Sequence, residues 1–112
     1  MSCKNKSSNG VSVLLNLVGA KWKLLIIREL LESEKRFSEL RKALGCTSKV
    51  LISCLRELEI DGLVVREEET INNISRIEYY LTDVGYTLRP VIKAMNDWGK
   101  DFKKFKKLME RV

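Results

Sequence analysis

Apolar side chains recur at alternating steps of three and four residues along the C-terminal part of the chain. They are Leu88, Val91, Met95, Trp98, Phe102, Phe105 and Met109. This spacing is a heptad repeat, which places all of them on one face of an α-helix. A chain of 112 residues has little surface of its own on which to bury so long a stripe. We therefore expect a dimerisation helix over about residues 83–110, although part of its stripe should pack on helices at 11–18 and 20–32 of the same chain.

The composition fits one globular domain and argues against an enzyme. Hydrophobic residues make up 45% and charged residues 32% of the sequence, which is ordinary for such domains. No apolar run reaches the ~18 residues of a membrane span, and the N-terminus lacks a secretory signal, so we expect a cytoplasmic protein without a membrane partner. Histidine is absent, which excludes a Ser-His-Asp triad and His-ligated metal. Because no glycine-rich phosphate loop or GxSxG elbow occurs either, we expect no catalysis and no cofactor.

The cysteines point to neither a disulfide framework nor a metal. Cys3, Cys46 and Cys54 have no CxxC spacing, and three thiols do not supply the four ligands of structural zinc. We expect Cys46 to be buried as a small hydrophobic residue. Cys54 is expected to be partly exposed, at the edge of a buried stripe. Cys3 and Cys54 are therefore the two candidates for redox sensing, and the alternative that neither thiol is reactive stays open.

The order of the expected elements indicates the fold. Residues 1–10 are polar and predict a flexible arm, and residues 11–112 a single domain. We expect helices over 11–18 and 20–32, a short strand at Arg36-Phe37, and a helix over 39–44 capped by Ser38. The next helix should run from Thr47 or Ser48 to Ile60. Strands over 63–66 and 77–81 should follow, around a loop at 70–75, and then a helix after Thr82 that Pro90 kinks or restarts. Two helices around a tight turn at Gly45-Cys46, followed by a hairpin, are typical of a winged helix-turn-helix. The expected fold is mainly α with a small β-hairpin wing at about 63–82.

Several short strings resemble the HxlR-type transcriptional regulators. They are Gly19-Ala20-Lys21-Trp22, Arg36-Phe37-Ser38-Glu39-Leu40-Arg41, Asp61-Gly62-Leu63-Val64, Glu78-Tyr79-Tyr80-Leu81-Thr82, and the C-terminal helix with Pro90 and Trp98, together spanning residues 12–102. The resemblance implies a winged-helix homodimer that binds operator DNA and represses or activates nearby genes. Many members of that family carry a redox-sensing cysteine about fourteen residues before the tryptophan, where this chain has Ser8. Many also have prolines in the wing, which this chain lacks.

In a helix-turn-helix, the N-terminal residues of the second helix approach base edges in the major groove. If Leu51, Leu55 and Leu58 face inward, the opposite face carries the candidates Ser48, Lys49, Ile52, Ser53 and Arg56. Ile52 either contacts a thymine methyl group or packs on a neighbouring helix. The candidates for phosphate contacts are Arg36, Arg41 and Lys42 at the preceding helix and Arg76 in the wing. Arg76 either reaches DNA while Glu67, Glu68 and Glu69 face away, or pairs with one of these glutamates.

The leading interpretation is a homodimeric repressor of a pseudo-palindromic DNA operator that responds to redox state or to a small molecule. The net charge of +6 suits a polyanionic partner but also fits solvated helix faces. One alternative is a regulator of the MarR or PadR kind, with Trp98, Phe102 and Phe105 lining a ligand pocket at the dimer interface. Another is a winged-helix module for protein assembly without DNA, favoured slightly by the acidic wing and by the near-neutral charge of residues 11–99. DNA binding that weakens steeply with salt would distinguish a DNA-binding regulator from this protein-assembly module.

Overall fold

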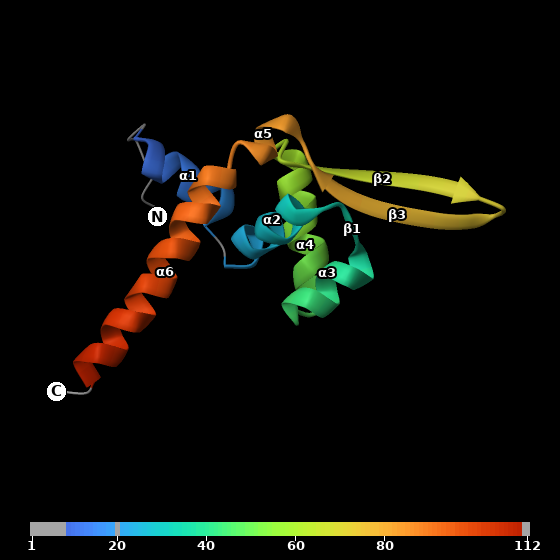
Figure 1. The fold of residues 1–112 in the computed structure, drawn as a ribbon. Helices are drawn as coiled ribbons and strands as arrows, with labels where there is room; N and C mark the ends of the chain where they lie inside the picture. The colour runs from blue at the N-terminus through green and yellow to red at the C-terminus, as the bar shows by residue number, and fades with distance from the viewer. Residues whose placement is uncertain (1–8, 20, 111–112) are drawn as a thin grey trace.

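The computed structural model describes residues 9–19 and 21–110 (Figure 1). The elements, in order, are α1 (Gly10–Val18), α2 (Lys21–Glu32), β1 (Lys35–Arg36), α3 (Phe37–Leu44), α4 (Ser48–Ile60), β2 (Val64–Ile71), β3 (Ile74–Leu81), α5 (Asp83–Tyr86) and α6 (Arg89–Glu110). The strands form one antiparallel sheet in the order β1-β3-β2. Nearly all of the predicted N-terminal arm, with Cys3 and Ser8, lies outside the described residues.

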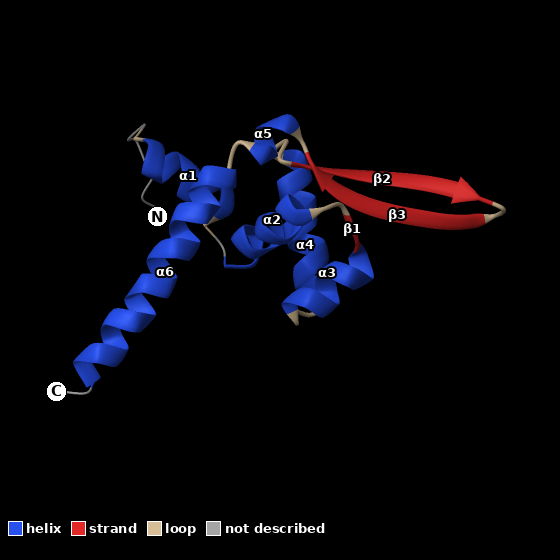
Figure 2. Ribbon diagram, viewed as in Figure 1, coloured by secondary structure: helices blue, strands red, loops and turns tan. Residues whose placement is uncertain are grey.

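The predicted winged-helix architecture is confirmed. A body of helices holds the core, the β2–β3 hairpin projects from one side of it, and α6 extends away from the opposite side (Figures 1 and 2). The molecule is accordingly elongated, with principal extents of 63 × 39 × 26 Å. Among the described residues, no single helix is long and apolar enough to cross a membrane, and only the bent pair α1–α2 reaches that length together.

The core forms where α2, α3, α4 and the base of the sheet meet. Its fully buried side chains are Val18, Ile26, Ile27, Leu30, Leu40, Leu51, Leu55 and Leu58. The apolar spacing of this segment predicts Trp22, Leu25, Ile26 and Leu30 on one buried face of α2. This is partly wrong, because Trp22 and Leu25 are only half-buried while Lys23 and Ile27 are buried. α2 packs against α1, α3, α4, α6 and β3, so neighbours cover more than one of its faces. A single amphipathic stripe does not describe such a central helix.

Local signals fix the helix-turn-helix. α3 begins at Phe37 with Arg36 as its N-cap, so the prediction of a Ser38 cap is wrong. The backbone N–H of Arg36 donates to a carboxylate oxygen of Glu39 over 2.8 Å, which holds the first turn. Gly45 ends α3 in the left-handed region at φ 71°, where glycine carries no steric cost. Of the two predicted caps, Thr47 and Ser48, it is Thr47 that caps α4, because its hydroxyl accepts a hydrogen bond from the N–H of Val50 over 3.2 Å.

The wing is longer than the sequence analysis expected. The residues predicted as a loop at 70–75 lie mostly in strand, with Thr70 opposite Ser75 and Ile71 opposite Ile74. Only Asn72 and Asn73 form the turn, and both have positive φ, at 52° and 65°. Such a two-residue turn matches the twist of the flanking strands, and asparagine tolerates this backbone region. The two asparagines therefore allow pairing to continue to the tip of the wing.

The C-terminal helix restarts at Pro90, as predicted. Thr82 caps the short α5, its hydroxyl accepting from the N–H of Gly85 over 3.0 Å. A Cβ at Gly85 would lie 2.4 Å from the carbonyl oxygen of Leu63, so this close approach of two segments requires glycine. α6 then begins at Arg89, with Pro90 in its first turn, where proline costs no hydrogen bond.

Candidate nucleic-acid interface

α4 is amphipathic in the way the sequence predicts. Leu51, Cys54, Leu55 and Leu58 are its buried residues, and they face the core. The opposite face, Ser48, Lys49, Ile52, Ser53 and Arg56, is exposed. The N-terminal turn of α4 carries no acidic residue, so its partial positive charge is not offset within that turn. The helix therefore presents an exposed polar, cationic face, as expected of a helix that contacts DNA.

Ile52 is the one apolar side chain among these five residues. It is 42% exposed, so it is open to solvent. It lines a groove between α4 and the wing. The thymine-methyl contact stays a prediction, now with an accessible side chain to make it.

The lysines and arginines predicted to contact DNA are both exposed and without ion-pair partners in the described chain. Arg36, Arg41, Lys42, Lys49, Arg56 and Arg76 are all exposed, and none of them forms an ion pair with another described residue. The ion pairs present in the described chain join other residues, such as Lys93 with Asp97. Lysine and arginine side chains without an internal partner can neutralise phosphate without first breaking a contact.

The register of the two wing strands determines which residues lie beside Arg76. It lies opposite Glu69, and Glu67 lies opposite Glu78. Directly opposed residues point to the same face of a sheet. The prediction that the wing glutamates face away from Arg76 is therefore wrong for Glu67 and Glu69. The alternative of an Arg76–glutamate ion pair is also absent among the described residues. Glu67 instead accepts from the Tyr80 hydroxyl over 3.3 Å, and partial burial together with this carboxylate raises the pKa of Tyr80.

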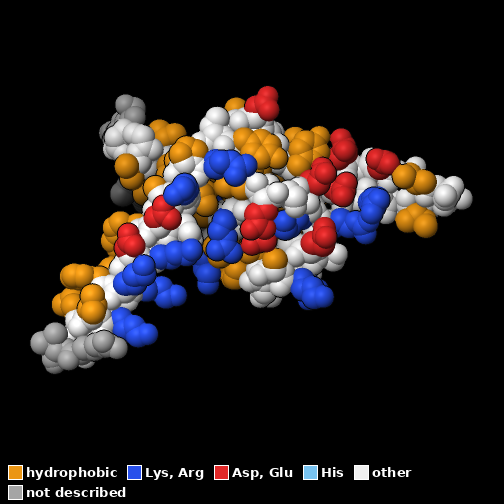
Figure 3. All heavy atoms as spheres, in the orientation of Figure 1, with side chains coloured by type: hydrophobic (Ala, Val, Ile, Leu, Met, Phe, Trp, Pro, Cys, Tyr) orange, Lys and Arg blue, Asp and Glu red, His pale blue; other side chains and the backbone are white. Residues whose placement is uncertain are grey.

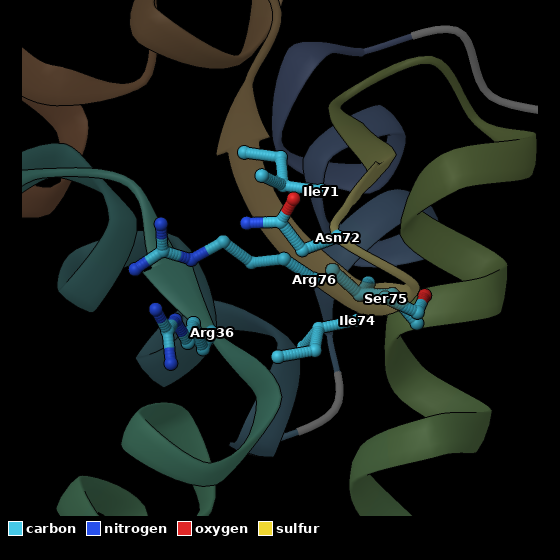
Figure 4. Close-up of a pocket in the computed structure, with 7 residues that line it drawn as sticks. Arg36, Ile71, Asn72, Ile74, Ser75 and Arg76 are labelled. Carbon is cyan, nitrogen blue, oxygen red and sulfur yellow. The ribbon is translucent and has the colours of Figure 1, made fainter.

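Arg36 and Arg76, predicted separately, line one opening of about 380 Å³. Figure 4 shows the Arg76 side chain extending from β3 toward Arg36 at the start of α3, with Ile71, Asn72 and Ile74 around them. Two guanidinium groups on one opening suit a phosphate or another oxyanion. Arg41 and Lys42 line neither this opening nor the groove beside α4, and stand on the exposed side of α3.

The groove between α4 and the wing has a volume of about 430 Å³. α4 contributes Ile52, Leu55, Arg56 and Glu59, and the other lining residues are Phe37, Arg66, Ile77 and Tyr79. Arg66 was missed by the sequence analysis. The two-residue alternation of a strand was the available signal, because it puts Arg66 on the same face as the buried Val64 and so toward α4.

A second, apolar surface lies on α6. Its N-terminal turns pack on the body, where Ile92 is buried and Leu88 is half-buried against the core. Val91 is half-buried, and the predicted residues from Met95 onward are exposed, Trp98 by 68% and Phe102 by 46%. The rings of Trp98 and Phe102 stack with centroids 5.3 Å apart. α1 also carries exposed apolar residues, namely Val11, Val13 and Leu15. Figure 3 shows hydrophobic side chains around both helices.

The burial of the two described cysteines agrees with the prediction for Cys46 and differs from it for Cys54. Cys46 is buried, as expected. Cys54 is only 9% exposed, so its expected partial exposure is wrong. Burial raises the pKa of the Cys54 thiol, while the nearby Lys23 ammonium lowers it by a smaller amount. Lys23 is itself buried and forms an ion pair with Glu57 of α4. The redox role of Cys54 stays a prediction, and Cys3 lies outside the described residues.

Fold and surface together define the class of this molecule. A helix-turn-helix with an exposed cationic second helix, followed directly by a two-stranded wing, makes it a winged helix-turn-helix DNA-binding protein. The chain belongs to the HxlR-like helix-turn-helix family, whose model matches residues 17–107. The resemblance noted from the sequence is thereby confirmed.

Its similarity to individual proteins is extensive. The chain is 41% identical over 95 residues to YdeP, an uncharacterized HTH-type transcriptional regulator of Bacillus subtilis, covering 83% of this chain and 73% of YdeP. It is 42% identical over 98 residues to another such regulator, from Halalkalibacterium halodurans, covering 86% of each. Among solved structures, the redox regulator HypR in its reduced form superposes with a TM-score of 0.81 at 34% identity, covering 88% of this chain and 98% of HypR. The oxidized form of HypR superposes with a TM-score of 0.76 at 36% identity, covering 83% of this chain and 96% of HypR.

Proposed function

We propose that two copies of this protein, joined through α6, bind a pseudo-palindromic double-stranded DNA operator in the cytoplasm and repress transcription there. The observation that carries this proposal is the distribution of cations on the helix-turn-helix and the wing. Six exposed lysines and arginines on or beside α3, α4 and β3 have no ion-pair partner in the described chain. A surface kept cationic in this way suits a polyanion.

The contacts divide by their position on the fold. The first turns of α4 approach the major groove, where Lys49 reaches guanine O6 or N7 and Ser48 and Ser53 contact bases or phosphate. Arg41 and Lys42 of α3 hold the backbone, since the first helix of the motif crosses it. Arg36 and Arg76, which share one opening, hold phosphate where the wing meets DNA.

The apolar face of α6 supports the dimer. Trp98, Phe102 and Phe105 project from the helix with about half or more of their surface exposed, and exposed aromatic stripes of this kind mark protein interfaces. Two-fold symmetry through α6 gives each dimer two copies of α4. These would read half-sites about one turn of DNA, ~34 Å, apart.

A redox response is the second part of the proposal. It is supported by the similarity to HypR, a redox regulator, and its candidate in this chain is Cys3. Cys54 is the weaker candidate, because burial and a raised pKa both keep its thiol protonated and covered.

The test is a salt titration of binding to the DNA upstream of the protein's own gene, against a scrambled duplex of equal length. We expect tight binding that prefers the upstream duplex and weakens steeply with salt, because several phosphates are neutralised. If oxidation abolishes DNA binding of the wild type but leaves binding of Cys3→Ser intact, the redox role of Cys3 is supported. If Cys3→Ser loses binding on oxidation as the wild type does, Cys3 is not the sensor. Weak, salt-insensitive binding to both duplexes would instead favour a winged helix used for protein assembly.

A further inference from the structure

Building on the proposed function, we propose that Arg66 binds a DNA phosphate, and that its ion pair with Glu68 must open for this to happen. Glu68 then acts as an internal competitor of DNA and sets how tightly the regulator binds. The ligand is a phosphodiester of the DNA backbone, lying in the groove between α4 and the wing.

Arg66 is positioned on the side of the wing that faces α4. It lies opposite the buried Tyr79, and Val64, two residues earlier on the same face, is also buried. Its side chain lines the same groove as Arg56 of α4. A backbone that leaves the major groove beside α4 and passes under the wing runs between these two guanidinium groups. The apolar Ile52 and Ile77, in the same lining, suit the deoxyribose beside the phosphate.

Glu68 is held ready to neutralise Arg66. One of its carboxylate oxygens lies 3.6 Å from a guanidinium nitrogen of Arg66. The other accepts from the Ser75 hydroxyl over 2.7 Å, which ties the carboxylate to the neighbouring strand. The two side chains are 39% and 49% exposed, and ion pairs this open to water are weak. A phosphate oxygen can therefore displace the carboxylate at small cost.

The other wing glutamates do not share this geometry. Glu67 and Glu69 alternate to the opposite face of β2 from Arg66 and Glu68. Glu69 forms no ion pair with a described residue and carries the same charge at nearly the same distance along the strand. It is consequently a matched control, since replacing it removes a negative charge from the wing without touching Arg66.

The experiment measures the affinity of the full-length protein for a fluorescent DNA duplex, and how that affinity depends on salt. The duplex is the one used to test the proposed function. The variants are Arg66→Gln, Glu68→Gln, the double variant, and Glu69→Gln with and without Arg66→Gln. We expect Arg66→Gln to weaken binding about tenfold and to lower the slope of log K against log salt by about 1. Glu68→Gln should tighten binding several-fold, but only while Arg66 is present. Glu69→Gln should have the same effect in both backgrounds.

Two results would overturn the inference. If Arg66→Gln leaves the salt slope unchanged, Arg66 binds no phosphate. If Glu68→Gln tightens binding equally with and without Arg66, Glu68 acts only as a general negative charge. Thermal unfolding of each variant shows whether a loss of binding reflects a loss of fold. Wild-type protein that shows no salt-steep binding to any duplex would refute the proposed function as well, whereas normal wild-type binding with an unaffected Arg66→Gln would refute this inference alone.

Discussion

α4 and α6 are both amphipathic helices, yet they use their apolar faces in opposite ways. α4 buries its apolar face entirely within its own chain and turns a polar, cationic face to solvent. α6 buries Ile92 near its start and then leaves its aromatic stripe exposed for several turns. The face that remains uncovered therefore indicates the partner of each helix, a polyanion for α4 and another protein surface for α6.

The energetic scale supports the proposed pairing of two copies through α6. Burying one large apolar side chain is worth about 1.5–3 kcal/mol. Trp98, Phe102, Phe105 and Met109 together leave several such contributions unused in the single chain. Pairing with a second copy would recover them, after the loss of translational and rotational freedom on association.

The largest effect should come from placing a charge in the apolar face of α6. Phe102→Asp would bury an unpaired carboxylate in the proposed dimer, and we expect a loss of about 3 kcal/mol or more, roughly 100-fold in the dimer dissociation constant. Sedimentation velocity over a concentration series measures it. Lys103→Asp, on an exposed residue one step along the same helix, is the control and should leave the dimer intact. Equal dimerisation of the two variants would contradict the assignment of this face.

The next effect concerns the core face of α4. Leu55→Ala removes a fully enclosed side chain, and we expect the free energy of unfolding to fall by about 2–5 kcal/mol. Chemical denaturation at a fixed protein concentration checks this. Ile52→Ala, on the exposed face of the same helix, should change stability by less than about 1 kcal/mol and weaken DNA binding instead. The comparison between the two helix faces fails if both variants destabilise the fold to a similar degree.

A smaller effect is expected from a cation on the reading face. Lys49→Ala should cost about 1–3 kcal/mol in DNA affinity and leave thermal stability unchanged, because Lys49 is exposed and has no ion pair in the described chain. Lys93→Ala on α6 removes the same charge from an exposed site whose lysine already pairs with Asp97. Fluorescence anisotropy should separate the two variants. A Lys93→Ala loss as large as that of Lys49→Ala would mean that overall charge, rather than position, governs binding.

The smallest effect is chemical and concerns the buried face of α4. Burial raises the pKa of Cys54, so the folded state holds the thiol protonated at a pH where the unfolded chain begins to ionise it. The stability that this contributes is present below the unfolded pKa and is lost as the pH rises through the folded pKa. At pH 8 we expect iodoacetamide to modify Cys54 much more slowly in the folded than in the unfolded protein, as peptide mapping would show. Equal rates would mean that the thiol is accessible and reactive.

The sequence was most informative where local chemistry decides the structure. Thr47 and Gly45 mark the turn between α3 and α4, and Pro90 marks the start of α6, as predicted. The inward stripe of α4 was also correct, because that helix has one buried face. The nine DNA-contact candidates are all exposed, including Ile52, for which packing on a neighbouring helix was the alternative, although their contacts with DNA remain predictions.

Features that depend on tertiary surroundings were harder to predict. Ile92 falls outside the heptad steps, yet it is buried because the first turns of α6 rest on the helical body. Lys23 is buried and forms an ion pair with Glu57 of α4, a pairing between residues distant in sequence. The orientation of Glu67 and Glu69 relative to Arg76 required the register of the hairpin, which the turn at Asn72-Asn73 determines.

A footprint on DNA tests most directly whether α6 pairs two copies of α4. The duplex would be selected from a random library with the wild-type protein and then cleaved by hydroxyl radicals in its presence. We expect two protected stretches on one side of the helix, about one turn or ~34 Å apart, with inverted sequence symmetry. In Phe102→Asp the same duplex should lose protection of both stretches at protein concentrations that saturate the wild type. A single protected stretch, or protection that survives Phe102→Asp unchanged, would contradict the paired arrangement.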